Sequence, residues 1–542
     1  MNKKLYLTII LLIVSSVAIY AQSGINSTVR VEREYEGKVM EVDKARIKTA
    51  VSDTLLNFKL HFDYPTFYRP YRDLYEFSPV STAQIKPSGV VRYPWLYTKL
   101  SVAYPLMPVA EIYVAPRFGS RFTALLHFNH HSLWSKSLGD RMTNDAGVNL
   151  AYKWSKGEAV VDFGYSGNFY TYMSDTAKIS DHHFDIFNVR ANLRSTDKAP
   201  NAFYYDVMLG YSYMADTQSN PLIGAIKENS IKGDISLGAT IRRVHKVFVQ
   251  VRNDLSMIDN FTLAEHYTVG VFDIRPTYRW ERGRWRLNLG VSVSSLYSQG
   301  NVDMDGKFVF APNVQASFEA VPSKFWLYAD VQGENSMMSM AEMFKYNPWM
   351  GSDFRVGRNV SPFGAQIGLR GVAGDQFGYN LYGGYRYYTC YSSFVTYNDA
   401  QAVLSGANNN AYVAAELMWN TRSFKLMADA KYQYFSNREY ALMTPSFEAH
   451  LNAEYNLRQR FYISADCYFR NRTLAGVLGD DQTVTYSSVN GFVDLGLKLT
   501  YVLNPGFSIF LEGKNLINSK IQYFSNTYEP GVNIAAGLYF KL

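Results

Sequence analysis

The sequence predicts an all-β fold, a transmembrane antiparallel β-barrel of about 22 strands in an outer membrane. Three observations carry this prediction. Apolar and polar residues alternate over long stretches, as in FVDLGLKLTYVL at residues 492–503. The chain is 47% hydrophobic and 16% aromatic, yet beyond residue 21 it has no apolar run long enough for a membrane helix. Short turns and longer polar loops also alternate along the chain.

Each expected strand has one apolar face and one polar face. In the 492–503 run, Val493 and Leu497 fall on one face, whereas Asp494 and Lys498 fall on the other. The pattern recurs in YDVMLGYSY (205–213), VFVQVRND (247–254), RLNLGVSVSS (286–295) and FKLMADAKYQY (424–434). Strands of about 9 to 11 residues suit a tilted crossing of a membrane. The alternative is a soluble β-sandwich, but the sequence lacks the second pattern of fully apolar core strands.

Short turns are expected at ten places, so the chain is expected to form eleven hairpins with both ends on the periplasmic side. They fall near residues 118–119, 155–157, 197–198, 244–245, 282–283, 322–323, 374–375, 421–422, 458–459 and 505–506. The longer polar loops include residues 214–229, 337–360, 391–408, 470–483 and 517–531. Short turns on one rim and long loops on the other are typical of outer-membrane barrels.

The two ends of the chain suggest export and assembly. Residues 1–21 have the layout of a secretory signal peptide, with two lysines, an apolar core and small residues up to Ala21. A single transmembrane anchor is the alternative, but the apolar run is short for one. The last strand, NIAAGLYFKL, is amphipathic and carries Phe540 near its end, a pattern that barrel-assembly machinery commonly recognises. We therefore expect a protein of the bacterial outer membrane.

Residues 22–93 precede the expected barrel, which spans residues 94–542. Their later part is aromatic and contains Pro65, Pro70, Pro79 and Pro87. Prolines at this density disfavour a packed helical domain and favour an extended segment. We expect this segment to lie in the periplasm or the lumen, or to dock on a partner. The alternative for its first 30 residues is disorder.

Charge and cysteine content exclude two classes of protein. The net charge of +7 comes from basic residues spread along the chain, so it does not indicate a nucleic-acid partner. Two cysteines are too few for a disulfide scaffold. Cys467 lies on the apolar face of its strand, so we interpret it as a small apolar residue and not as a nucleophile.

The C-terminal region resembles the barrel of TonB-dependent outer-membrane receptors, which has 22 strands. The resemblance rests on FLEGKNLINSKIQYF…YEPGVNIAAGLYFKL (510–542), with its Asn515-Leu516, Tyr523 and Pro530-Gly531, and on NPWM at residues 347–350. Members of that family carry an N-terminal plug domain, for which residues 22–93 are too few. The resemblance therefore implies a plugless relative and does not extend to ligand-gated active import.

Charged residues on the polar faces are candidates for the lumen wall. Their expected role is to solvate a channel or to pair with one another across the wall. They are Arg252, Asp254, Arg370, Asp429, Lys431, Asp494 and Lys498.

No catalytic, metal or cofactor site is expected. His127 and His131 of HFNHH share a polar face, but along a strand they lie roughly 13 Å apart, too far to share one ion without a bend. Ser, Asp and His residues are common in the loops, yet no spacing singles out a nucleophile with its base.

Three classes of function remain, and the weakest of them is an enzyme at the rim of the barrel. The first is transport through a wide or partner-gated conduit, because side chains alone do not fill a barrel of about 22 strands. The second is a structural or assembly subunit of an outer-membrane complex, with a periplasmic or surface-lipoprotein partner. An open lumen favours the first function, and a filled lumen favours the second.

Overall fold

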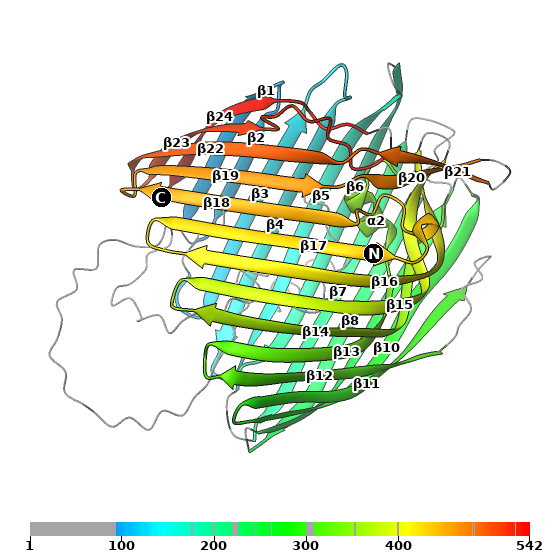
Figure 1. Cartoon of the computed structure of the whole chain (residues 1–542), viewed down its shortest axis with the longest axis vertical. Coiled ribbons are helices and arrows are strands. Elements are labelled where there is room, and N and C mark those ends of the chain that lie inside the picture. Colours follow the sequence, from blue (N-terminus) through cyan, green and yellow to red (C-terminus); the bar gives the residue numbers. More distant parts are fainter. Residues whose placement is uncertain are drawn as a thin grey trace, which may run out of the picture.

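A computed structural model describes residues 94–542, with gaps at 117, 175–176, 198, 200, 219–225, 243, 262, 300–307, 352–353, 398–399, 480, 482 and 526. The expectations for residues 1–21 and 22–93 lie outside the described residues. Almost every described element is a β-strand (Figure 1). Within the same residues, no helix has the length and apolar character needed to span a membrane.

The wall of the molecule is one closed antiparallel β-barrel. Its first half contains β1 (Leu96–Tyr104), β2 (Val109–Val114), β3 (Phe122–Leu133), β4 (Arg141–Trp154), β5 (Gly157–Ser174), β6 (Ala177–Ser195), β7 (Phe203–Gln218), β8 (Ile226–Ile241), β9 (His245–Asn260), β10 (Glu265–Arg282) and β11 (Trp285–Gln299). Its second half contains β12 (Phe308–Val321), β13 (Phe325–Met337), β14 (Arg358–Ala373), β15 (Phe377–Tyr397), β16 (Ala400–Asn420), β17 (Phe424–Phe435), β18 (Phe447–Leu457), β19 (Phe461–Arg470), β22 (Phe492–Asn504), β23 (Phe507–Lys514) and β24 (Asn533–Lys541).

The barrel closes through its two terminal strands. β1 pairs with β24 from Tyr97↔Lys541 to Tyr104↔Ile534, so neither strand presents a free edge. β19 pairs directly with β22. The two strands between them, β20 (Thr473–Leu478) and β21 (Val484–Val489), form a separate hairpin. The wall therefore has 22 strands, and the predicted fold class is confirmed.

The strands turn their apolar faces outward. On β22, Leu497 is 40% exposed and Leu499 is 42% exposed, whereas Asp494 is 5% and Lys498 3% exposed. A soluble sandwich would show the reverse, with the leucines buried and the charges in water. The alternation that the sequence shows is thus the alternation of a membrane barrel.

All ten expected short turns join neighbouring strands at one rim, which Figure 1 shows at the left. The turns between β10 and β11 and between β14 and β15 place Gly283 and Gly374 at φ values of 60° and 64°, which glycine adopts without a Cβ clash. We call the opposite rim the outer rim, because the long loops of outer-membrane barrels face outward.

The predicted loops at the outer rim are correct in part. The expected loop at 391–408 is wrong, because β15 and β16 are 21 residues each and pair out to Tyr397↔Ala400. Strands also occupy the ends of the 214–229 loop, and the 470–483 loop contains β20. Polar residues in these places indicate strands that continue beyond the lipid, since the backbone pairs equally well in water.

Candidate functional site at the outer rim

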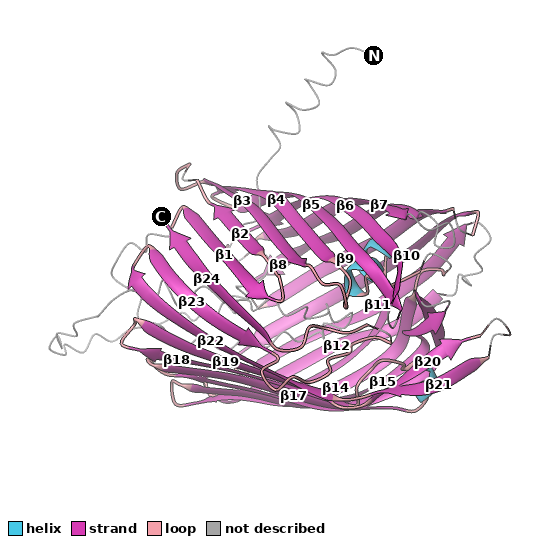
Figure 2. Ribbon diagram, turned by 90° about the horizontal axis from the view of Figure 1, so that it is seen from above, coloured by secondary structure: helices cyan, strands magenta, loops and turns pink. Residues whose placement is uncertain are grey.

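The connection between β13 and β14, residues 338–357, contains a short helix, α2 (Met340–Tyr346), that lies within the ring of strands (Figure 2). The helix begins with a capping box. The Ser339 hydroxyl accepts a hydrogen bond from the Glu342 amide at 3.2 Å, and the Glu342 carboxylate accepts one from the Ser339 amide at 3.0 Å. A helix of seven residues is marginal alone, so its position depends on the strands around it.

Strand β8 holds the start of α2. The fully buried carboxylate of Glu228 accepts the amide of Met340 at 3.0 Å and the amide of Ala341 at 2.8 Å. These amides have no partner within a helix, and a negative charge at a helix N-terminus is favourable. In the same first turn, Glu342 forms an ion pair with Lys232, also on β8. Two charged contacts therefore fasten α2 to one side of the wall.

The apolar side of α2 packs against strands β6 to β10. The Phe344 ring is fully buried and lies 5.4 Å from the Phe184 ring and 5.0 Å from the His182 ring. Ile258 and Val269 belong to the same buried cluster. This cluster is the largest apolar core of the described residues, and it forms where the loop meets the barrel interior.

A buried histidine and a buried aspartate hold the chain that follows α2. The His182 side chain on β6 and the Asp216 side chain on β7 are both fully buried, and His182 Nε2 lies 2.9 Å from Asp216 Oδ1. The other ring nitrogen, Nδ1, lies 3.2 Å from the carbonyl oxygen of Pro348. If Nδ1 carries the proton, the ring donates to that carbonyl.

The connection between β23 and β24, residues 515–532, meets the same region from the other side. The Arg141 guanidinium donates to both carboxylate oxygens of Glu529, at 2.8 and 2.9 Å, and to the carbonyl of Tyr528 at 2.6 Å. It also lies 4.9 Å from the centre of the Trp349 ring. The guanidinium thus reaches the carboxylate through Nη1 and the Tyr528 carbonyl through Nη2, and the cation–π contact with Trp349 further fixes its orientation. Arg141 therefore joins the two loops.

A third connection, residues 436–446 between β17 and β18, completes the layer. The amide of Met443 donates to the carbonyl of Leu474 at 2.8 Å, and Met443 packs in a cluster with Trp349 and Phe524. The Tyr346 ring lies 5.8 Å from the Phe524 ring. We call residues 338–357, 436–446 and 515–532 together the lid.

Asn515 at the start of the third lid segment acts as a local anchor. Its side chain donates to the carbonyls of Ser519, at 2.8 Å, and Pro530, at 3.1 Å, and accepts the amide of Ser519 at 2.8 Å. Its backbone amide donates to Asp494 at 3.0 Å. The residue has φ of 50°, which asparagine tolerates better than most residues. Nearby in the same segment, burial raises the pKa of Tyr523 well above its usual value.

The seven predicted lumen residues do not meet in one place. Arg252 of β9 donates to the carbonyl of Asn335 on β13 at 2.8 Å, and its Nε lies 3.8 Å from Asp254 Oδ2. Since β10 to β12 separate β9 from β13 in the wall, this hydrogen bond crosses the barrel interior close to the lid. Arg370 stands apart on β14, with its guanidinium 5.9 Å from the Trp326 ring.

The other four residues lie on β17 and β22. Asp429 Oδ1 is 3.6 Å from His450 Nδ1, and the Lys431 ammonium is 5.3 Å from the Tyr412 ring. Asp494 holds the Asn515 amide. The Lys498 ammonium lies 4.5 Å from the Phe510 ring and 3.8 Å from Glu512.

The sequence reasoning missed the residues that position the lid. Glu228, Lys232 and Arg141 each lie on a polar strand face, and nothing local marks them as partners of a distant loop. The start of the helix could have been found in the sequence, because Ser339 and Glu342 form a capping-box pattern before an apolar run. Among the described residues, no three His, Cys, Asp or Glu side chains gather as a metal site.

Comparisons with known proteins identify the architecture. No family model matches the sequence, and no curated protein does. Solved structures do match. An FrpB iron transporter from Neisseria meningitidis aligns with a TM-score of 0.64 at 9% identity, covering 84% of this chain and 82% of that one. The fold is that of a TonB-dependent receptor barrel.

Further receptors of this kind show the same fold. FpvA from P. aeruginosa, solved with bound heterologous pyoverdines, aligns with a TM-score of 0.62 at 12% identity, over 82% of this chain and 71% of that one. The siderophore receptor PirA from Acinetobacter baumannii gives 0.61 at 9% identity, over 84% and 81%. The predicted resemblance to TonB-dependent receptors is confirmed at the level of the fold, which is what such identities establish.

Proposed function

We propose that the chain is a transport barrel of the bacterial outer membrane and that its own lid closes the outer mouth. The observation that carries this proposal is the attachment of α2 inside the ring of strands through Glu228. Structural neighbours named as iron, copper and siderophore transporters or receptors support transport, not catalysis, as the role of the barrel.

The polar inner wall fits a wet path for a solute. Arg252, Asp254, Arg370, Asp429 and Lys431 present charge on the polar faces of their strands, which gives a path hydrogen-bond partners along its length. With Asp494 and Lys498 they are our candidates for residues that solvate this path. In this account, transport requires the lid to move, because the apolar cluster around Phe344 fills the space beside the wall.

The lid can be removed without cutting the barrel. Met337 at the end of β13 pairs directly with Arg358 at the start of β14, so a tight two-residue turn can replace residues 338–357. In cells that make this variant, we expect faster entry of a chromogenic solute that a periplasmic enzyme hydrolyses. A control places the same two-residue turn at residues 261–264, between the directly paired Asn260 of β9 and Glu265 of β10, outside the lid. Equally slow entry for both variants and for cells without the protein would contradict a transport role.

The second candidate function is a platform in an outer-membrane complex. The β20–β21 hairpin favours it, because among the described residues β21 pairs with β20 alone, while β20 is bridged to β15, and the hairpin exposes Tyr486 and Val477. An exposed strand edge with apolar side chains is a typical site for strand addition by a partner. A surface lipoprotein is the partner we propose for this hairpin, because a periplasmic protein would meet the barrel at the opposite rim. The last strand, β24, would engage the assembly machinery during insertion. Co-purification that depends on the hairpin would test it.

A further inference from the structure

The lid, together with the end of β13 that leads into it, is unusually rich in methionine. Residues 337–350 contain five of the 17 methionines of the chain, namely Met337, Met338, Met340, Met343 and Met350. A sixth, Met443, reaches the same region from the 436–446 segment. Methionine is often a flexible filler of apolar gaps, and Met340 and Met350, both fully buried, fit that role.

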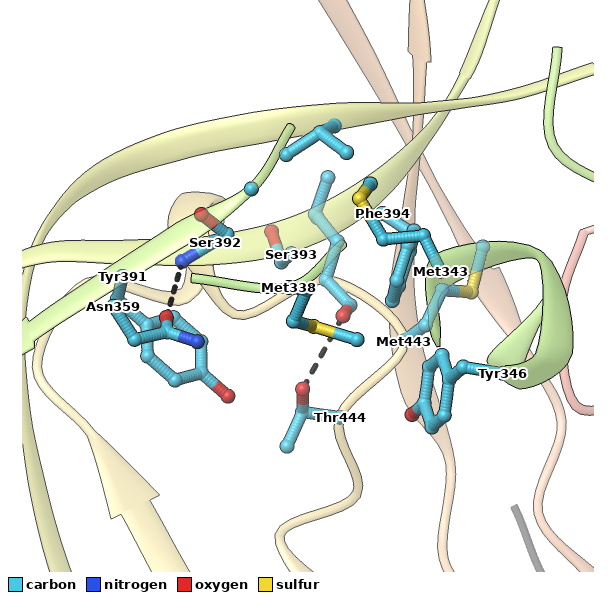
Figure 3. A pocket seen from close by; sticks show the side chains of 13 residues that line it. Met338, Met343, Tyr346, Asn359, Tyr391, Ser392, Ser393, Phe394, Met443 and Thr444 are labelled. Carbon is cyan, nitrogen blue, oxygen red and sulfur yellow. Dashed lines mark hydrogen bonds between the residues drawn. The ribbon is translucent and has the colours of Figure 1, made fainter. Parts of the chain in front are cut away.

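Three of these methionines do not only fill a core. Met338, Met343 and Met443 line one small pocket between the two lid segments (Figure 3). The pocket has a volume of about 40 Å³, which is room for a few water molecules or one ion. The rings of Tyr346 and Phe394 stand beside the methionines.

The polar atoms of the pocket are few, and one of them has no assigned partner. The Ser392 amide already donates to Asn359 at 2.9 Å, and the Thr444 hydroxyl donates to the carbonyl of Leu442 at 3.3 Å. In contrast, Ser393 is 4% exposed and its Oγ has no hydrogen-bond partner among the described residues. A buried hydroxyl in this state indicates a water molecule or a ligand at the site.

We propose that this pocket binds a soft monovalent metal ion, Cu(I), through the thioether sulfurs of Met338, Met343 and Met443. Thioethers are soft, neutral ligands that select Cu(I) over hard divalent ions. The described residues that line the pocket include no acidic residue, histidine or cysteine. The aromatic rings add a favourable face for a cation. A water molecule on the ion would provide the partner that Ser393 lacks.

A bound ion would join two segments of the lid. Met338 and Met343 belong to residues 338–357, whereas Met443 belongs to residues 436–446. Binding to the closed arrangement alone stabilises that arrangement by mass action. The inference concerns binding and does not rest on the proposed transport function.

The test uses Ag⁺, a redox-inert soft ion, on the purified mature full-length chain in detergent. Substitutions Cys390→Ser and Cys467→Ser form the background, because a thiolate would bind Ag⁺ by itself. Equilibrium dialysis with metal analysis then gives the stoichiometry and the affinity. We expect one tight Ag⁺ per chain and no comparable binding of Zn²⁺.

Leucine replaces methionine with little change of volume, so each variant should still fold. Met343→Leu or Met338→Leu should weaken Ag⁺ binding by at least about tenfold. Substituting a residue that only supports a metal ligand already costs about that much, and these variants remove a ligand itself. The control is Met257→Leu on β9, where the side chain is 38% exposed on the outer face of the strand, opposite to Ile258, which packs against the lid. An absence of tight binding, unchanged affinity in the pocket variants, or equally tight Zn²⁺ binding would overturn the proposal.

Discussion

The clearest consequence of the lid geometry concerns Glu228. Its carboxylate is fully buried and accepts two backbone amides, those of Met340 and Ala341. In Glu228→Gln, one oxygen becomes an NH₂ group, which cannot accept a hydrogen bond, so one amide loses its partner. A hydrogen bond to a charged group contributes about 1.5–3 kcal/mol, and a buried unpaired amide costs about 1–3 kcal/mol. Part of this lost free energy is recovered, because the neutral glutamine side chain costs less to bury than a carboxylate.

The net cost to the closed lid is roughly 1–3 kcal/mol, which increases its opening equilibrium about 5- to 150-fold. Hydrogen–deuterium exchange measures this directly, because amides of a locally opening segment exchange through that opening. Peptides covering residues 338–350 should exchange faster in Glu228→Gln, and peptides from β15 and β16 should not.

Asp206→Asn is the matched control, because this carboxylate on neighbouring β7 is partly buried, and the hydrogen bond that it accepts comes from Asn192, at 3.0 Å. Asp206→Asn should leave the hydrogen–deuterium exchange of residues 338–350 unchanged. Unaltered exchange at residues 338–350 in Glu228→Gln, or faster exchange spread evenly over the barrel, would refute the reasoning.

Three further predictions follow from the same contacts. Arg141→Lys keeps the charge, but its single nitrogen cannot take the place of Nη1 on Glu529 and Nη2 on the Tyr528 carbonyl together. The 515–532 segment should therefore be cut several-fold faster in limited proteolysis with chymotrypsin, and unchanged cleavage would show that Arg141 does not hold it. Asn515→Gly should lower the free energy of unfolding, because the side-chain hydrogen bonds are lost. Asn515→Ala should lower it by about 1 kcal/mol more, because alanine is strained at positive φ. Wild-type stability of the glycine variant in a denaturant titration would contradict the anchor role. Deletion of residues 22–93 should leave a heat-modifiable barrel on electrophoresis, and loss of folding would mean that the first strand was misplaced.

Local rules were sufficient to predict the barrel from the sequence. Strand faces follow from a period of two, and a turn such as Arg282-Gly283 marks the rim by its composition alone. The Asn515-Leu516 pair was recognised by resemblance, and the structure supplies its physical role as a hydrogen-bond anchor for the last loop.

The lid could not be predicted in the same way. Glu228 and Met340 are 112 residues apart, and Arg141 and Glu529 are 388 apart, so no local pattern connects them. The 391–408 segment was misjudged for a related reason. Its serines, asparagines and glycine favour a loop, whereas the strands continue beyond the lipid and bury Val395 and Ala402 against the lid.

Conductance of the purified protein in a planar lipid bilayer tests most directly whether the barrel's own loops close its outer mouth. The wild-type chain should give at most brief, small openings. The variant in which a two-residue turn replaces residues 338–357 should carry large, steady currents. Large, steady currents through the wild-type protein, equal to those of the variant, would contradict closure by the lid.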